Sequence, residues 1–551
     1  MLDVYKNNKI DNILISLFNT RLLILTGALF LPLLVMNSGM ISANIDSLIL
    51  YLIMSTGFLT GIFIFKKSIS NPVISYLILQ MVLFFIFFDK KILSHFGLNL
   101  KLYGVVFIIA LSVAIYHLIK NFKYLWNSFP LFKYFFVYFI LMGLYLLFHY
   151  HSDFRLSNDL LSLRYAQSLK VGGLGNSQTS REFGDLAQYI LHIEWLIPIV
   201  SIIVPLMLFK GLKTIEAINN RLIIIIKYFS AITLIHLSLA GIAYLFGLNN
   251  SFLSIGAVND VDSGYFFPIF LYILLGFKYY LTNLSLNRDK DFISIILNSA
   301  IAYILILIIS AGIITGGSSA MVLGMITGLL IILFLNSFLG LDFPFFFSCI
   351  KGNTIALNKK INIAHRLTDL QNQKLKTVLF IGIVAITILY LVQRMAKAFN
   401  GDVLTLNMRF DHWRDSYQLW ISSLNLFKVI FGYGLDTLRE AIYFASNSSA
   451  IERGIVSPHN MFILMIYEQG LIAFIYLTGI ISTLLTSIKY IKDKTLNINV
   501  KIFSIVNIGV VAAIFAMWCF IDMALISRII FLSTLGFLES VKFAYANVNK
   551  E

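Results

Sequence analysis

Charged side chains are scarce in this chain of 551 residues. Asp, Glu, Lys and Arg make up 13% of it, whereas hydrophobic residues make up 59%. The mean hydropathy is +0.85, and so few charged groups cannot cover the surface of a soluble domain with this much apolar side chain. The composition therefore excludes a soluble globular protein and predicts a polytopic membrane protein. The net charge of +15 would suggest nucleic-acid binding in a soluble protein, but here the basic residues lie between long hydrophobic runs, so nucleic acid is not an expected partner.

Cysteine is almost absent. Cys349 and Cys519 are the two cysteines, and their positions indicate neither a disulfide scaffold nor a metal site. A glycine-rich phosphate cradle is also lacking, because the Gly-Gly-Ser-Ser sequence at 316–319 predicts only a short turn between hydrophobic runs. The first hydrophobic run follows 21 residues of mixed polarity and has no small-residue cleavage site after it. It is predicted to be a retained span rather than a signal peptide.

Long hydrophobic runs dominate the remainder of the chain. A helix needs about 20 apolar residues to cross roughly 30 Å of hydrocarbon, and 14 segments are candidates. The sequence therefore predicts an all-α polytopic protein with about 14 transmembrane helices, forming a single transmembrane domain over 1–551. The candidate spans lie near 22–36, 47–65, 73–88, 102–119, 131–149, 187–209, 222–246, 264–281, 292–313, 320–338, 377–393, 459–488, 500–520 and 525–543.

The basic residues predict the orientation of these spans. If the N-terminus is cytoplasmic, 26 of the 42 Lys and Arg fall in cytoplasmic segments and 15 in external ones, with Lys227 inside a span. Lys542, near the end of the last span, is counted here with the cytoplasmic tail. Because cytoplasmic loops are enriched in Lys and Arg, both termini are predicted to be cytoplasmic.

Three long polar loops follow from this topology. The first polar external loop is 150–185, the largest cytoplasmic loop is 341–376 with six basic residues, and the large external loop is 394–458 with seven. The cytoplasmic loop fits the topology bias and attraction to anionic headgroups. Positive charge on the outside runs against that bias, so an anionic ligand is one explanation for 394–458.

Within 394–458, apolar residues spaced 3, 4, 3 and 4 apart predict an amphipathic helix that packs on the membrane domain or its interface. They are Phe410, Trp413, Tyr417, Trp420 and Leu424. The side predicted to face water has Asp411, Arg414, Asp415 and Gln418. Arg409 lies at the edge of the apolar stripe, where a guanidinium can bind phosphate oxygens. An ion pair with Asp411 or Asp415 is the alternative.

Two further motifs lie in the second half of the 394–458 loop and at its end. Phe-Gly-Tyr-Gly at 431–434 lets Gly432 and Gly434 adopt positive φ or allow close backbone approach, so the motif is an ordinary turn or a substrate contact. Pro458 is predicted at the first position of the next span, which puts the His459 imidazole at the span's mouth. That imidazole can take a proton from a sugar hydroxyl, or it is a hydrogen-bonded interfacial residue.

Glu468 is a less favourable partner for His459 on helical geometry. Nine residues on an ideal helix correspond to about 900°, half a turn out of phase, and to roughly 13 Å along the axis. Unless Gly470 marks a distortion of the helix, Glu468 has a different role.

Together these residues resemble the O-antigen polymerase and O-antigen ligase superfamily of bacterial envelope glycosyltransferases. The resemblance is specific over about 405–475 and looser over roughly 250–475. Two features depart from it: the turn at 316–321 lacks the family's Ser-Arg, and the loop at 255–259 has an asparagine but no arginine. The matching residues are Arg409, Trp413, Phe431-Gly432-Tyr433-Gly434, His459-Asn460, Glu468 and Gly470.

The resemblance implies a GT-C-like fold and a metal-free, cofactor-free transfer of glycan from an undecaprenyl-diphosphate carrier at the outer face of the bacterial inner membrane. It implies that His459 and Arg409 are catalytic, His459 as the base and Arg409 on the diphosphate. A second phosphate-binding arginine is then expected in 150–185, with Arg164 favoured over Arg155 and Arg181, although any of them can instead form a structural salt bridge. The implied substrate-binding residues are Arg164, Trp413, Gly432, Gly434 and Asn460.

Several activities share this motif. The leading hypothesis is a polymerase that joins lipid-linked repeat units into a polysaccharide, with a chain-length regulator as a further candidate partner. The alternative is a ligase that transfers the glycan to lipid A-core. A transporter or flippase for lipid-linked sugars is the alternative of another class, and it predicts ionisable residues near the membrane midplane.

Overall fold

The computed structural model describes residues 41–43, 98–100, 102–151, 197–225, 319–338, 410, 413–414, 416–418, 420–421, 426–432, 460–519 and 525–548. The helices are α5 (Leu102–Ser128), α6 (Pro130–His151), α9 (Ile197–Leu206), α14 (Ser319–Phe338), α18 (Leu426–Phe431), α21 (Met461–Gln469), α22 (Ile472–Lys492), α23 (Ile498–Trp518) and α24 (Leu525–Val548). A further helical run covers 215–225.

The described part is an all-α membrane protein apart from two short strands. Three helical segments are long and apolar enough to cross a membrane: Ile472–Lys492, Ile498–Trp518 and Arg528–Val548. Several predicted spans, including those before residue 98, lie outside the described residues, so the total of about 14 stays a prediction. The same holds for the loop at 341–376 and, beyond the end of α6 at His151, for the loop at 150–185.

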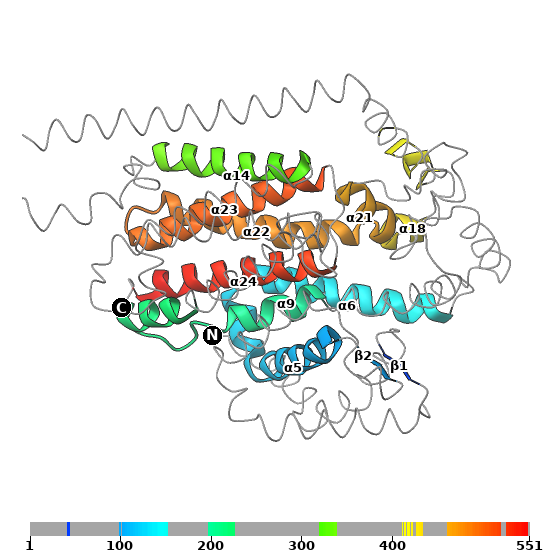
Figure 1. The fold of residues 1–551 in the computed structure, drawn as a ribbon, viewed down its shortest axis with the longest axis horizontal. Coiled ribbons are helices and arrows are strands. Elements are labelled where there is room, and N and C mark those ends of the chain that lie inside the picture. The colour runs from blue at the N-terminus through cyan, green and yellow to red at the C-terminus, as the bar shows by residue number, and fades with distance from the viewer. Residues whose placement is uncertain are drawn as a thin grey trace, which may run out of the picture.

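The two strands pair with each other, and each lies in a loop that the charge count places on the same side of the membrane. β1 (Ile41–Ala43) pairs antiparallel with β2 (Leu98–Leu100), and Ser42 lies opposite Asn99. Charge counting puts the connections at 37–46 and 89–101 both outside. Figure 1 shows the strands at the same end of the bundle as α18.

The α5–α6 hairpin has a tight connection and an irregular first helix. α5 continues nine residues past its predicted span end at 119, and Asn121 interrupts its helical geometry with φ −125° and ψ 16°. A single residue, Phe129, separates the two helices. α6 then begins at Pro130, a favoured residue for the first helical position because its missing N–H has no intrahelical acceptor there.

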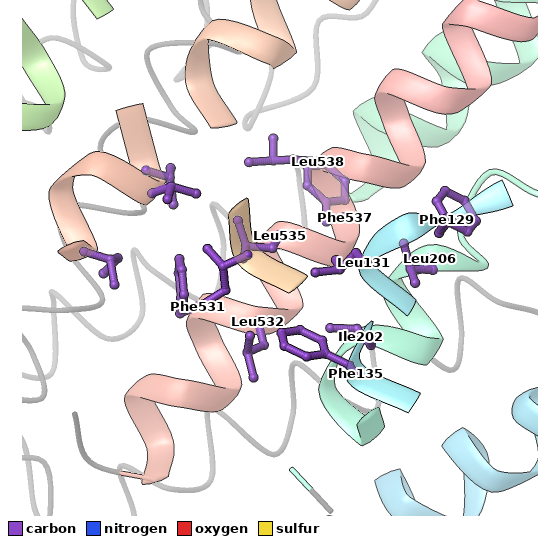
Figure 2. Packing of buried hydrophobic residues seen from close by; sticks show 14 of the residues in the cluster. Phe129, Leu131, Phe135, Ile202, Leu206, Phe531, Leu532, Leu535, Phe537 and Leu538 are labelled. Carbon is purple, nitrogen blue, oxygen red and sulfur yellow. The ribbon is translucent and has the colours of Figure 1, made fainter. Parts of the chain in front are cut away.

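α24 lies in the centre of the bundle. Figure 2 shows Leu532 of α24 beside Phe135 of α6, whereas the ring of Phe531 meets that of Trp518 of α23 with centroids 5.8 Å apart. α9 approaches closely because α24 has Gly536 at the crossing, where a Cβ would lie 3.1 Å from the Ile202 carbonyl oxygen. The core is thus formed by helices from both halves of the chain.

Small residues also bring α14 against α23. A Cβ on Gly509 of α23 would lie 2.5 Å from a side-chain carbon of Ile332 and 3.3 Å from the carbonyl oxygen of Gly328. On the other side, a Cβ on Gly324 would lie 2.9 Å from the carbonyl oxygen of Ala513. Gly324 and Gly328 form a Gly-xxx-Gly pair, the arrangement that lets helix backbones approach closely in membranes.

A buried polar cluster crosses α22, α23 and α24, and it corrects the expectation for Lys542. Instead of belonging to the tail, Lys542 is fully buried and its Nζ lies 2.5 Å from Glu539 Oε1. The same ammonium donates to Ser487 Oγ at 2.6 Å, and Asn507 Nδ2 donates to that hydroxyl at 3.0 Å. Glu539 and Lys542 are three residues apart on one helical face, so each charge has its partner within α24.

Candidate functional site at the α18–α21 joint

Three of the seven predicted site residues are described. They are Trp413, Gly432 and Asn460, whereas Arg164, Arg409, Gly434 and His459 lie outside the described residues.

The predicted span at 459–488 is broken into α21 and α22. The break is at Gly470, with φ 57° and ψ −138°, and its N–H donates to Ile466 O at 2.9 Å. The next amide, that of Leu471, donates to Val429 O of α18 at 2.9 Å. Because an unpaired backbone group is unfavourable in a membrane, α18 supplies the acceptor that a continuous helix would have supplied.

Gly432 is the other half of this contact. It follows α18, has φ 77°, and donates its N–H to Lys428 O at 2.8 Å. A methyl group at Gly432 would overlap the carbonyl of Glu468, and one on Gly470 would lie 2.5 Å from Val429 O. We call this contact between Gly432 and Gly470, with the adjoining ends of α18 and α21, the two-glycine joint. For Gly432, backbone packing accounts for the glycine, so substrate binding by this residue stays a prediction.

Aromatic residues of α6 support the joint. The ring of Tyr145 stacks on Phe431 with centroids 5.4 Å apart and 7° between the planes. Deeper along the same helix, Tyr138 donates its hydroxyl to Gln469 Oε1 at 3.2 Å. α6 therefore contacts both α18 and the last residue of α21, which holds the two short helices together (Figure 1).

Glu468 lies in the last turn of α21, beside the joint. It is 4% exposed. α21 is a regular helix from Met461 to Gln469, and the rise of about 1.5 Å per residue puts Glu468 roughly 10 Å along the axis from Met461. The distortion at Gly470 comes after Glu468, so it does not turn this side chain back toward the start of the helix. A role for Glu468 separate from that of His459 fits this geometry.

Asn460 determines where α21 begins. The helix starts at Met461, three residues later than the predicted start at Pro458, because Asn460 is extended and caps it. Its Oδ1 accepts from the amides of Phe462 and Ile463 at 3.0 and 3.1 Å, as a good N-cap residue does. Its Nδ2 donates to Cys519 O at 3.2 Å. The side chain thereby ties the start of α21 to the end of α23.

The amphipathic helix around Trp413 is helical at its described positions. Its predicted polar side is confirmed for Arg414 and Gln418, which are exposed. Phe410 and Tyr417 are 54% and 59% exposed, respectively, whereas Ser416 is buried. The apolar stripe therefore does not pack wholly against protein, and its exposed rings fit the membrane interface, where aromatic side chains are enriched. The rings of Phe410 and Trp413 meet edge to face, with centroids 5.2 Å apart.

The sequence identified Gly432 and Gly470 individually but did not predict that they lie in contact. The residues lie 38 positions apart, and no local periodicity links them. It also missed α18 as a separate helix, because six residues are too few to show a helical pattern. Within the described residues, no three His, Cys, Asp or Glu side chains lie close enough to hold a metal ion.

Comparison with protein families, with curated proteins and with solved structures finds no match to this chain.

Proposed function

We propose that the chain is a membrane glycosyltransferase that joins undecaprenyl-diphosphate-linked glycan units at the outer face of a bacterial inner membrane. One contact supports the proposal. Gly432, Glu468 and Gly470 are three of the residues on which the resemblance to O-antigen polymerases and ligases rests, and they meet in the two-glycine joint. A local turn at 431–434 alone would not require contact with a residue 36 positions further along the chain.

The proposed chemistry assigns complementary tasks to the two ends of the loop at 394–458. The acceptor sugar's hydroxyl attacks the anomeric carbon of the donor, and His459 takes the hydroxyl proton. The bond from that carbon to the diphosphate oxygen breaks, and the carrier diphosphate leaves with the electron pair. Arg409, with Arg164 as the favoured second cation, stabilises the negative charge on the leaving group. A carrier diphosphate lies at headgroup level, so these cations must lie just outside the hydrocarbon.

The two-glycine joint would serve this chemistry by holding the far end of α21, the helix whose start Asn460 fixes. Asn460 caps α21 and bonds to the end of α23, while Gly470 and Leu471 fix its other end on α18. The residue before Asn460 is His459, so a rigid α21 restricts where the imidazole can lie. Positioning of this kind contributes substantially to catalysis when the reacting groups are held in contact.

The proposal predicts that His459→Ala and Arg409→Ala each abolish glycan transfer while the protein still inserts and accumulates. Transfer is measured with the purified protein in detergent and a purified lipid-linked glycan. Arg414→Ala is the matched control, because it removes the same charge from an exposed position five residues further along the loop. Normal transfer by either His459→Ala or Arg409→Ala would refute the site assignment.

Two outcomes separate the related activities. After gene deletion, lipopolysaccharide core with a single repeat unit on a gel indicates a lost polymerase, whereas bare core indicates a lost ligase. Absence of any transfer in detergent by the folded wild-type protein would favour a flippase. The Glu539–Lys542 pair does not favour the transporter hypothesis, because the carboxylate and the ammonium form an ion pair with each other within α24.

A further inference from the structure

The kink of α5 holds a lysine from another segment. At the kink, Asn121 Nδ2 donates to His117 O at 3.1 Å, one turn earlier. Asn121 Oδ1 then accepts from Lys210 Nζ at 2.5 Å. Lys210 belongs to the turn after α9, so a buried amide at an irregular helical position fixes where this ammonium lies. Figure 1 shows that turn at the opposite end of the bundle from α18.

A second ammonium is held on the same helix. Lys120 Nζ donates to the hydroxyl of Tyr116 at 3.3 Å and lies 5.5 Å from the centre of that ring. Lys210 Nζ lies 4.9 Å from the ring centre of Tyr124. Both cations are therefore positioned by a hydrogen bond and an aromatic face within two turns of α5, unlike lysines that extend freely into solvent.

These two positive charges lack a negative partner in the described part of the chain. The ion pair between Lys542 and Glu539 involves neither of them. Burial lowers the pKa of Lys210 from its usual value, and the positive charge of Lys120 lowers this pKa further. Both ammoniums are held against the same two turns of α5, and since like charges repel each other, a bound anion would offset that repulsion.

We propose that Lys120 and Lys210 form a binding site for one anionic phosphate group at the predicted cytoplasmic surface of the membrane. An ammonium has three donors, and each lysine uses one within the protein, so two on each remain for phosphate oxygens. The pair lies beyond the predicted ends of two spans, at 119 and 209, where lipid phosphates lie. Exposed Lys213, three residues after Lys210, adds to the attraction for an anionic membrane surface.

The ligand class follows from the geometry. Two point charges from different segments suit a compact oxyanion with acceptors on several sides, and lysine is a common phosphate binder of this kind. The phosphate can belong to an anionic lipid headgroup or be free in solution. The site is remote from the two-glycine joint, so it stands or falls independently of the proposed glycosyltransferase.

The test measures thermal unfolding of the purified full-length protein in detergent. Phosphatidylglycerol, phosphatidylcholine or inorganic phosphate is added separately to the wild type and to K120Q/K210Q. The matched control is K489Q/K492Q, which removes two exposed lysines from the last turn of α22 at the same end of the bundle. K120R/K210R retains both charges and checks whether charge removal, rather than misfolding, causes any loss.

We expect phosphatidylglycerol to raise the unfolding midpoint of the wild type, the control and K120R/K210R by several degrees. The shift in K120Q/K210Q should be less than half as large. A response to phosphatidylglycerol alone identifies a lipid headgroup as the source, and a response to inorganic phosphate identifies the free anion. Equal shifts in K120Q/K210Q and the wild type, equal shifts with phosphatidylcholine, or no shift with either anion would overturn the proposal.

Discussion

Gly432 and Gly211 share a backbone conformation but differ in their surroundings. Their φ angles are 77° and 78°. A Cβ at Gly211 would have nothing within 4 Å, whereas one at Gly432 would overlap the backbone of Glu468 and Gln469. The comparison separates the effect of a left-handed conformation from the effect of the two-glycine joint.

We predict that Gly211→Ala destabilises the protein by about 1–2 kcal/mol, the usual effect of placing a Cβ in the left-handed region. Gly432→Ala should lose a further 1–3 kcal/mol or so, as overpacking does, because the backbone of α21 cannot move aside as a flexible side chain can. It should also abolish glycan transfer by displacing α21. Unfolding by SDS in mixed micelles measures both stabilities. Equal losses in the two variants would show that α18 and α21 are not in contact.

The sequence identified the individual glycines but could not decide their role. The sequence predicts positive φ or close backbone approach at Gly432, and the structure has both there and adds the partner. That partner is the backbone of Glu468 and Gln469, and a backbone contact leaves no trace in the identity of the residues it touches. Asn460 is similar, because an asparagine before an apolar run is a recognisable cap, yet its bond to Cys519 O depends on the packing of α23.

At the scale of elements, the long apolar helices were the most predictable. α14 and α23 each lie within two residues of their predicted spans at 320–338 and 500–520, because a continuous apolar run permits little besides a helix in a membrane. The break between α21 and α22 needed tertiary information. A glycine in an apolar run is tolerated in a helix, and here the carbonyl of Val429 makes the break favourable.

The cluster around Lys542 connects α22, α23 and α24. Replacing Lys542 alone should destabilise the protein more than replacing Lys542 and Glu539 together. Lys542→Met leaves Glu539 buried without its ammonium, and breaking such a pair destabilises a protein by about 3–5 kcal/mol. The double variant Glu539→Leu/Lys542→Met leaves no isolated charge, so we predict that it recovers much of that loss. Lys489→Met, at an exposed position, is the control and should have little effect.

Adding Glu539→Leu completes a double-mutant cycle of the wild type, the two single variants and the double variant. SDS unfolding measures the stability of each. A favourable coupling between Glu539 and Lys542 is expected because they are in direct contact. Additive effects of the two single substitutions would mean that the ammonium and the carboxylate do not interact in the folded protein.

For the whole molecule, the arrangement of the ends agrees with a single orientation in the membrane. The basic connections after α9 and α22 lie at one end of the bundle, and α18 and the β1–β2 pair lie at the other (Figure 1). Charge counting along the sequence assigned the first two to the cytoplasm and the others to the outside. Both proposals depend on this orientation, because a carrier diphosphate must reach the outer face and the Lys120–Lys210 site is predicted to be inside.

Cysteine labelling tests the orientation directly. In a background with Cys349 and Cys519 replaced by serine, Arg414→Cys should react with a membrane-impermeant maleimide in intact cells, because it is exposed at the predicted outer end. Lys213→Cys and Lys494→Cys, both exposed at the other end, should react only after the inner membrane is permeabilised. The reverse pattern would invert the topology and exclude Arg409 and His459 from an external site. Labelling of Lys213→Cys and Lys494→Cys from opposite sides would instead contradict the bundle, because the connections after α9 and after α22 lie at the same end of it (Figure 1).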